Sequence, residues 1–133
     1  MKNILKVEAR QFIIINFFLV FLIQACTKTI PKSQLVFKGC EIYLNKKLFT
    51  GKFELNKGGK YILGKVLNGK ISNEKTFSND ILLMEKNYFK CDSGIQKNFN
   101  HQGKIISIGS FVSHKRVGEW KYFRKDGVYS IIY

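Results

Sequence analysis

The sequence of 133 residues is poor in the residue types that usually carry chemistry. It has two histidines, His101 and His114, and nine acidic residues scattered along the chain. No His, Cys, Asp or Glu residues have the spacing of a metal site, and no pair of carboxylates is marked for acid–base catalysis. Phosphate-binding loops, nucleophile elbows and Cys/His arrangements are missing as well. We therefore expect a protein without a catalytic site, a metal or a cofactor.

Proline is nearly absent too, since Pro31 is the only one. Turns must then be built from Gly, Asn and Asp, which tolerate a positive φ. Such residues separate short segments rich in β-branched and aromatic side chains, at 56–59, 68–69, 78–80, 92–94, 101–103 and 126–127. Residues 49–55 alternate apolar and polar positions, and no stretch after Cys26 combines helical periodicity with caps. The pattern predicts an all-β fold.

The segments also repeat. Residues 58–77 align with residues 102–123, and the alignment places Gly64 on Gly109, Lys70 on Lys115 and Glu74 on Glu119. The separation of about 45 residues is typical of two stacked supersecondary units of about 22 residues each. Because one hairpin alone is only marginally stable, we expect stacked β-hairpin repeats that form one elongated antiparallel sheet.

The stretch "GEWKYFRKDG" at 118–127, preceded by "GSFVSHKRV", resembles the MORN-variant repeat of bacterial proteins. That unit pairs a Gly-x-aromatic-x-aromatic strand with an Asn/Asp-Gly turn and a second strand. The resemblance covers roughly residues 48–128 and fails at 79–87, where the expected glycines are missing. It implies hairpins stacked along one sheet with aromatic rings between them, so Trp120 and Tyr122 are expected in the core.

The first 25 residues have the organisation of a signal peptide. Lys2, Lys6 and Arg10 precede the apolar run Phe12–Ile23. This run is too short to span a bilayer, which takes about 20 residues, but its length suits the apolar region of a signal peptide. The alternative, a buried helix, predicts polar residues at helical spacing, and the run has only Asn16.

The end of this segment, Leu22–Cys26, resembles the lipobox of bacterial lipoproteins. The resemblance implies cleavage before Cys26, a diacylglycerol on its thiol and an acylated amino group, which together anchor a protein stably. Residues 26–34 then form the lipidated cysteine and a polar tether, and residues 35–133 form the repeat domain. Thr27 after the lipidated cysteine implies an outer-membrane location facing the periplasm.

The formal net charge of +14 raises the question of nucleic-acid binding. Lysines outnumber arginines by 20 to 3, whereas base and phosphate recognition favour arginine. We therefore expect a solvated lysine surface and no nucleic-acid partner. The densest basic turn contains His114, Lys115 and Arg116. It is interpreted either as a contact for anionic head groups or an acidic glycan, or as a charged hairpin tip.

Two cysteines remain once Cys26 is assigned to the lipid. Cys40 and Cys91 suit one disulfide in an oxidising compartment. Two buried free thiols that pack as small apolar residues are the alternative. Spacing alone leaves both readings open, because it does not show whether the two residues are close.

Three hypotheses on function follow. The first is a lipid-anchored envelope protein whose sheet is a non-catalytic binding or scaffolding module for an envelope protein or an acidic glycan. The second is a cytosolic inhibitor of an acidic protein, because MORN-variant proteins include antitoxins. The third is an envelope enzyme with an unrecognised site, which requires a deep pocket containing two of four carboxylates, Glu74, Asp80, Glu85 and Asp92.

Overall fold

The computed structural model describes residues 28–133, so the predicted signal peptide and Cys26 lie outside the described residues. This part of the chain is all-β, as predicted. It contains one short 3-10 helix, η1 (Lys32–Gln34), and twelve strands: β1 (Thr29–Pro31), β2 (Val36–Lys38), β3 (Glu41–Leu44), β4 (Lys47–Leu48), β5 (Gly51–Lys57), β6 (Lys60–Leu67), β7 (Lys70–Ser78), β8 (Ile81–Tyr88), β9 (Ser93–Phe99), β10 (Ile105–Val112), β11 (Lys115–Arg124) and β12 (Gly127–Ile132).

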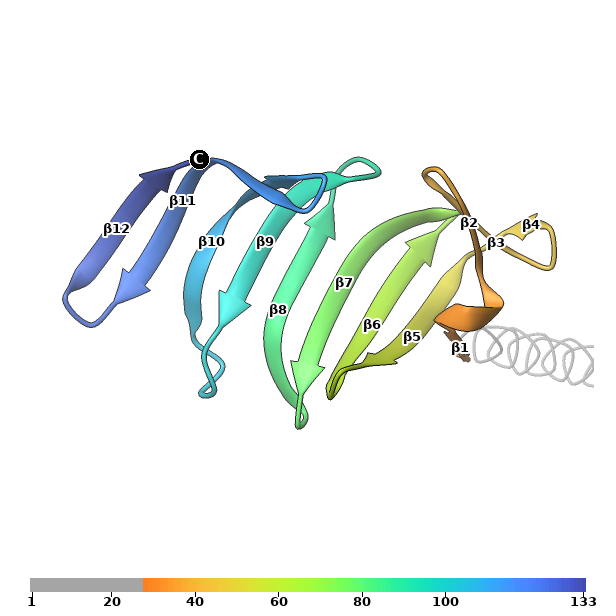
Figure 1. Ribbon diagram of the computed structural model, residues 1–133, viewed down its shortest axis with the longest axis horizontal. Helices are drawn as coiled ribbons and strands as arrows, with labels where there is room; N and C mark the ends of the chain where they lie inside the picture. The colour runs from red at the N-terminus through yellow and green to blue at the C-terminus, as the bar shows by residue number, and fades with distance from the viewer. Residues whose placement is uncertain (1–27) are drawn as a thin grey trace, which may run out of the picture.

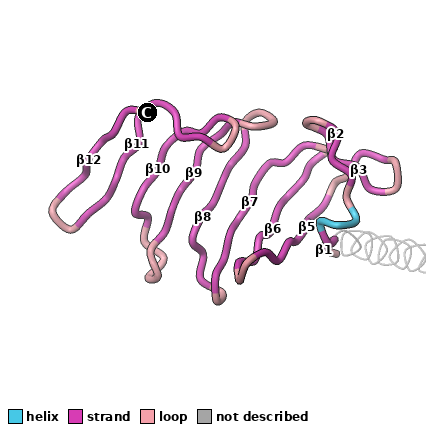
Figure 2. Tube along the Cα trace, in the orientation of Figure 1, coloured by secondary structure: helices cyan, strands magenta, loops and turns pink. Residues whose placement is uncertain are grey.

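Nine of the strands form one open sheet that is elongated across the strands (Figure 1). From β5 to β12 they follow one another in chain order, and each pairs antiparallel with the next. The predicted elongated sheet of stacked hairpins is therefore confirmed. Short connections at the two ends of the strands join them (Figure 2), as expected for a sheet built from local hairpins.

The N-terminal part departs from a purely antiparallel sheet in two ways. Strand β1 pairs parallel with β5, and β2, β3 and β4 form a separate three-stranded sheet. A parallel pair needs a long crossover, and the segment from η1 to β4 supplies it. Residues 29–34, predicted as part of the tether, thus form β1 and η1 against the domain.

Two-residue turns with a positive φ at both positions close five hairpins, as type I′ turns require. They are Asn45–Lys46, Gly58–Gly59, Asn68–Gly69, Asn79–Asp80 and Ser113–His114. The turn at Asn79–Asp80 lies in the segment that lacks the expected glycines. Asn and Asp tolerate this conformation, so the β7–β8 hairpin forms without them.

The repeat alignment has a structural counterpart in two glycines opposite aromatic residues. Gly64 of β6 is the cross-strand partner of Phe53 on β5. Gly109 of β10 is the partner of Trp120 on β11. Phe53 and Trp120 are both buried, whereas Tyr122 is only half-buried. The expectation that the aromatic residues of the last repeat are core holds for Trp120 and only in part for Tyr122.

The main hydrophobic cluster lies where the small sheet covers β5 to β7, and it consists of Leu35, Ile42, Phe49, Phe53 and Val66. Backbone hydrogen bonds tie the small sheet to the β6–β7 turn, because Ile42 donates to Gly69 at 2.8 Å and Gly69 donates to Phe49 at 2.7 Å. Burial of these five side chains requires both sheets, so the N-terminal segment is an integral part of the domain.

Candidate functional site

The Cys40–Cys91 disulfide joins the two parts of the domain. Cys40 lies in the β2–β3 turn and Cys91 in the β8–β9 connection, and the structure links their sulfurs at 2.00 Å. Of the two states that the sequence leaves open, the structure therefore has the disulfide. The bond ties the small sheet to the β8–β9 connection, in the middle of the large sheet. The small sheet is thus attached at a second place besides the β6–β7 turn.

A cavity of about 540 Å³ lies beside this disulfide. Its walls combine apolar side chains with two lysines, and none of its lining residues is acidic. The lining consists of both cysteines of the disulfide with Leu67, Lys70, Ile71, Ser72, Tyr88, Phe89 and Lys90. Such a cavity suits a ligand group that carries negative charge next to an apolar part.

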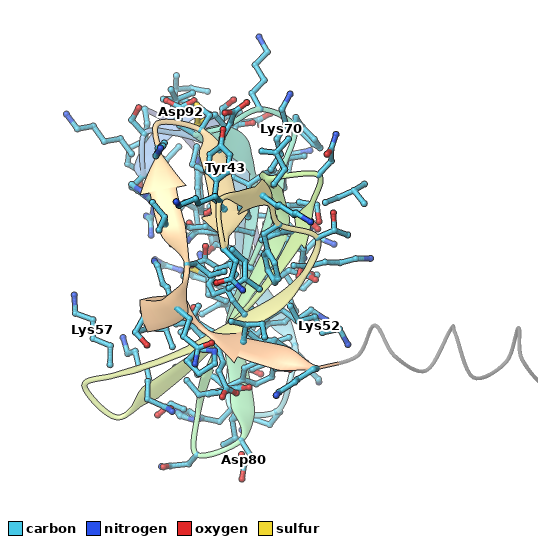
Figure 3. The ribbon with its side chains drawn as sticks, turned by 90° about the vertical axis from the view of Figure 1, so that its right-hand side faces the viewer. Tyr43, Lys52, Lys57, Lys70, Asp80 and Asp92 are labelled. Carbon is cyan, nitrogen blue, oxygen red and sulfur yellow. A yellow bond between two sulfur atoms is a disulfide. The ribbon has the colours of Figure 1, made fainter. Side chains whose placement is uncertain are left out.

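The same end of the strands carries further basic side chains. Lys70 follows the β6–β7 turn, Lys90 follows β8, and His114 lies in the β10–β11 turn. Figure 3 shows Lys70 and Asp92 at one end of the strands and Asp80 at the opposite end. The carboxylate of Asp92 accepts a hydrogen bond from the Ser113 hydroxyl at 2.7 Å. We call the set of Lys70, Lys86, Lys90, His114 and Lys115, at this end of the strands, the basic cluster.

Lys86 is the least expected member of the basic cluster, because only 8% of its surface is exposed. Its ammonium lies 3.4 Å from His114 Nδ1 and 5.0 Å from the centre of the Phe111 ring. His114 accepts this hydrogen bond only when Nδ1 is unprotonated. Among the described residues no carboxylate lies within ion-pair distance of Lys86. The charge of Lys86 is thus held by an aromatic ring and an imidazole.

The carboxylate of Glu74, on β7 opposite Lys86, binds a tyrosine and not this lysine. Glu74 is the cross-strand partner of Lys86 but accepts a hydrogen bond from the Tyr88 hydroxyl at 3.2 Å. Burial, together with the Glu74 charge, raises the pKa of Tyr88 far above its ordinary value. Tyr88 therefore stays a neutral donor at physiological pH.

The three residues predicted to contact an anion do not converge. His114 contacts Lys86, whereas Lys115 is exposed and, by strand alternation, faces away from Arg116. The Arg116 guanidinium lies 4.6 Å from the Trp120 ring centre. Arg116 Nη1 donates to the hydroxyls of Tyr122 and Tyr133 at 2.6 and 3.1 Å. Arg116 thus supports the C-terminal hairpin.

The two tyrosines beside Arg116 form a coupled pair. Their hydroxyls lie 2.7 Å apart. The hydrogen bond with Tyr133 raises the pKa of Tyr122, while the hydrogen bonds from Tyr122 and then from Arg116 lower the pKa of Tyr133. Because one negative charge beside Arg116 is favourable and two are not, the pair ionises in sequence with Tyr133 first.

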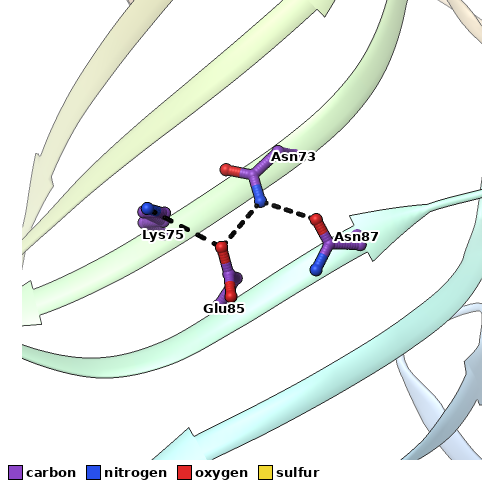
Figure 4. A network of polar contacts seen from close by, with 4 residues as sticks. All are labelled: Asn73, Lys75, Glu85 and Asn87. Atoms are coloured by element: carbon purple, nitrogen blue, oxygen red, sulfur yellow. Dashed lines mark hydrogen bonds and ion pairs between the residues drawn. The ribbon is translucent and has the colours of Figure 1, made fainter. Parts of the chain in front are cut away.

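The four carboxylates considered for catalysis are spread over the sheet. Glu85 accepts a hydrogen bond from Asn73 at 3.2 Å and pairs with Lys75 at 3.7 Å (Figure 4). Asn73 also donates to Asn87, at 2.9 Å. Glu74 and Asp92 bind the tyrosine and serine described above, and Asp80 lies in a turn. Neither the cavity beside the disulfide nor a second one of about 460 Å³ between 100–106 and 123–125 is lined by a carboxylate.

The described residues also lack other features of known sites. Between residues 28 and 133, no group of three or more His, Cys, Asp or Glu side chains is placed to hold a metal ion. Within the same range, no helix is long and apolar enough to cross a membrane. Cys26, the predicted lipidation site, lies outside the described residues.

Comparison with known proteins shows no matching family, no similar curated protein and no similar solved structure. The MORN-variant resemblance therefore stays a prediction.

Sequence reasoning missed Lys86, because it lies in the segment that departs from the repeat pattern and is 28 residues from His114. Its position opposite Glu74 on a neighbouring strand predicts an ion pair, which the structure does not have. Tyr133 and Phe111 were missed as partners of Arg116 and Lys86 because cross-strand contacts depend on register.

Proposed function

We propose that this chain is a lipid-anchored protein of the cell envelope whose sheet is a non-catalytic binding module for an acidic partner group. The Cys40–Cys91 disulfide is the observation that supports the proposed location in the cell envelope. Structural disulfides persist in oxidising compartments and are rare in the cytosol. The bond therefore supports export, which the signal-peptide pattern of residues 1–25 also predicts.

The same bond argues against the second hypothesis, a cytosolic antitoxin-like inhibitor. An enzyme is not favoured either, because neither of the two cavities described above is lined by a carboxylate. A binding module requires a rigid surface with accessible recognition groups. The hydrogen-bonded ladders from β5 to β12 supply that rigidity, and the basic cluster supplies the charge.

The anchor is tested by substituting Cys26. Cys26→Ala is expected to leave the precursor uncleaved and unlabelled by a palmitate analogue. The lipid-modified form of the protein should then be missing from the membrane fraction. Cys40→Ala/Cys91→Ala is the matched control, because it removes the two other cysteines without removing the predicted lipidation site. Unchanged labelling of the Cys26→Ala chain would overturn the anchor and leave the binding surface to be judged separately.

The binding surface is tested with heparin as a model polyanion. Lys70→Glu/Lys90→Glu reverses two charges at the cavity, and we expect its affinity to fall by at least tenfold at physiological salt. Lys57→Glu/Lys60→Glu makes the same change of net charge at the opposite end of the strands and is expected to have a much smaller effect. Equal losses in both variants would show that the lysines act only through total charge.

A further inference from the structure

The two edges of the nine-stranded sheet differ in how they are protected against pairing. At one edge lies β1, which has only three residues and includes Pro31. A short edge strand and a proline both discourage the addition of another strand. At the other edge lies β12, whose six residues are all exposed and include neither a charged side chain nor a proline. Within residues 28–133, this edge has none of the usual protections.

The exposed side chains of β12 are mostly apolar on both faces of the sheet. Val128 is 61% exposed, Ile131 47% and Ile132 75%, and Tyr129 is exposed as well. The pairing of β12 with β11 runs without a register shift from Gly127 to Ile132. A regular, apolar edge strand of this kind is a template for another strand.

The hydrogen-bond pattern identifies the backbone groups that are free to pair. Gly118 and Tyr133 exchange both of their backbone hydrogen bonds, at 3.1 and 3.0 Å. Because such pairs alternate along an antiparallel ladder, Ile131 and Tyr129 also bond to β11. The N–H and C=O groups of Val128, Ser130 and Ile132 must then point away from β11, toward the open side.

We propose that two copies of this chain pair through this edge, with β12 antiparallel to β12 of the second copy and Ser130 on the twofold axis. In this register Ser130 faces its own counterpart and the three outward-pointing residues supply six backbone hydrogen bonds. Val128 faces Ile132 of the second copy on one side of the sheet, and Tyr129 faces Ile131 on the other. From Val128 to Ile132 the cross-strand pairs are thus apolar or Ser with Ser, as favourable strand pairing requires. The Ser130 hydroxyl donates to Glu119 of its own chain at 2.6 Å.

Charge favours a second copy over an acidic partner at this edge. Strand β12 offers no cation to an acidic peptide. Lys121 of β11 is the cross-strand partner of Ser130, and in the dimer it lies three strand spacings, about 14 Å, from its counterpart. The basic residues of the β11–β12 turn, Arg124 and Lys125, lie at the outer ends of the twofold pairing. At about 3.4 Å per residue the two turns are about 30 Å apart, well beyond the screening length of about 10 Å at 0.1 M salt. The positive net charge of the chain therefore does not prevent this contact.

Cysteine cross-linking of the full chain in membranes or detergent tests the register. In the proposed dimer the Cα atoms of residue 130 are about 5.5 Å apart across the axis, which is within disulfide range. Those of residue 131 are displaced by two residues and lie about 8 Å apart, which is out of range. Ser130→Cys is expected to yield a disulfide-linked dimer on oxidation, whereas Ile131→Cys stays at the level of the unsubstituted chain, which also controls for Cys26. Equal cross-linking of both variants, or none by Ser130→Cys, would overturn the proposal.

Sedimentation in density-matched detergent tests the assembly without cross-linking. The unsubstituted chain is expected to have twice the chain mass. Ser130→Lys places two lysines face to face on the axis and is expected to reduce the assembly to single chains. Val36→Lys changes a residue that is 52% exposed and lies in the small sheet, away from this edge, and it should leave the dimer intact. A single-chain mass for the unsubstituted protein, or a dimer of Ser130→Lys with an unchanged circular dichroism spectrum, would contradict the pairing.

Discussion

The indole ring of Trp120 lies across Gly109 of the neighbouring strand, so closely that a β-carbon on residue 109 would stand 2.4 Å from ring atoms. The ring is fully buried, and its Nε1 donates to the Ser110 carbonyl at 2.8 Å. Phe53 covers Gly64 in the same way near the other end of the sheet, where a β-carbon would stand 2.1 Å from the ring. Phe53 is also covered by the small sheet, whereas Trp120 lies far from it, so there the glycine opposite the ring makes room to bury an aromatic side chain on an open sheet.

Gly109→Ala is therefore expected to destabilise the domain, because the added methyl group displaces Trp120. Overpacking of this kind costs about 1–3 kcal/mol. The free energy of unfolding, followed by the fluorescence of this single tryptophan in urea, measures the effect. Ser110→Ala changes the adjacent exposed residue and should cost less than about 0.5 kcal/mol. Equal stability of Gly109→Ala and the unsubstituted protein would show that the ring does not rest on residue 109.

Removal of the disulfide is expected to destabilise the domain more strongly. The two cysteines are 51 residues apart, and closing a loop of this length in the unfolded chain is worth about 4 kcal/mol in the chain-entropy model. Cys40→Ser/Cys91→Ser should lower the free energy of unfolding by about 2–4 kcal/mol. A reducing agent should lower the stability of the unsubstituted protein and leave the double variant unchanged. Equal sensitivity of both proteins to reduction would contradict this pairing.

Arg116→Lys tests whether the C-terminal hairpin depends on the shape of the guanidinium group. An ammonium keeps the charge but loses the planar contact with Trp120 and the fixed geometry toward two hydroxyls. Because the residue is exposed, the expected loss is only about 1 kcal/mol. Lys115→Arg, at the adjacent exposed position, is the control and should be neutral. Thermal unfolding of both variants measures the difference.

The tyrosine pair predicts a specific pH dependence. The hydrogen bond from Tyr122 is the main reason why the pKa of Tyr133 is lowered. Tyr122→Phe should therefore raise the pKa of Tyr133 toward its ordinary value. Since the folded-state pKa lies below the unfolded one, ionisation of Tyr133 contributes stability that appears as the pH rises through the folded pKa and is fully present above the unfolded pKa.

Titration of tyrosinate absorbance checks this order of ionisation. In the unsubstituted protein the earliest step should belong to Tyr133, and it should disappear in Tyr133→Phe. Tyr43→Phe removes a tyrosine whose pKa is raised by Glu41 and should leave the first step in place. A first step that survives Tyr133→Phe would contradict the assigned order.

The hairpins could be predicted from sequence because each depends on residues close together in the chain. Gly, Asn and Asp at two-residue turns determine where a strand reverses, and alternation determines which residues share a face. The turn at Asn79–Asp80 illustrates this, because its conformation survives where the repeat pattern fails. The all-β class, the chain order of the strands and the burial of Trp120 follow from such local signals.

Contacts between distant segments were decided only by the tertiary structure. Nothing in the spacing of Cys40 and Cys91 indicates that the β2–β3 turn reaches the β8–β9 connection, because this requires the crossover from β1 to β5 to fold over the sheet. Lys86 contacts His114, 28 residues away in the chain, while Glu74 on the neighbouring strand accepts a hydrogen bond from Tyr88. Sequence periodicity does not encode this choice of partner. The amino-acid sequence determined the hairpins, and the packing of distant segments determined the disulfide and the basic cluster.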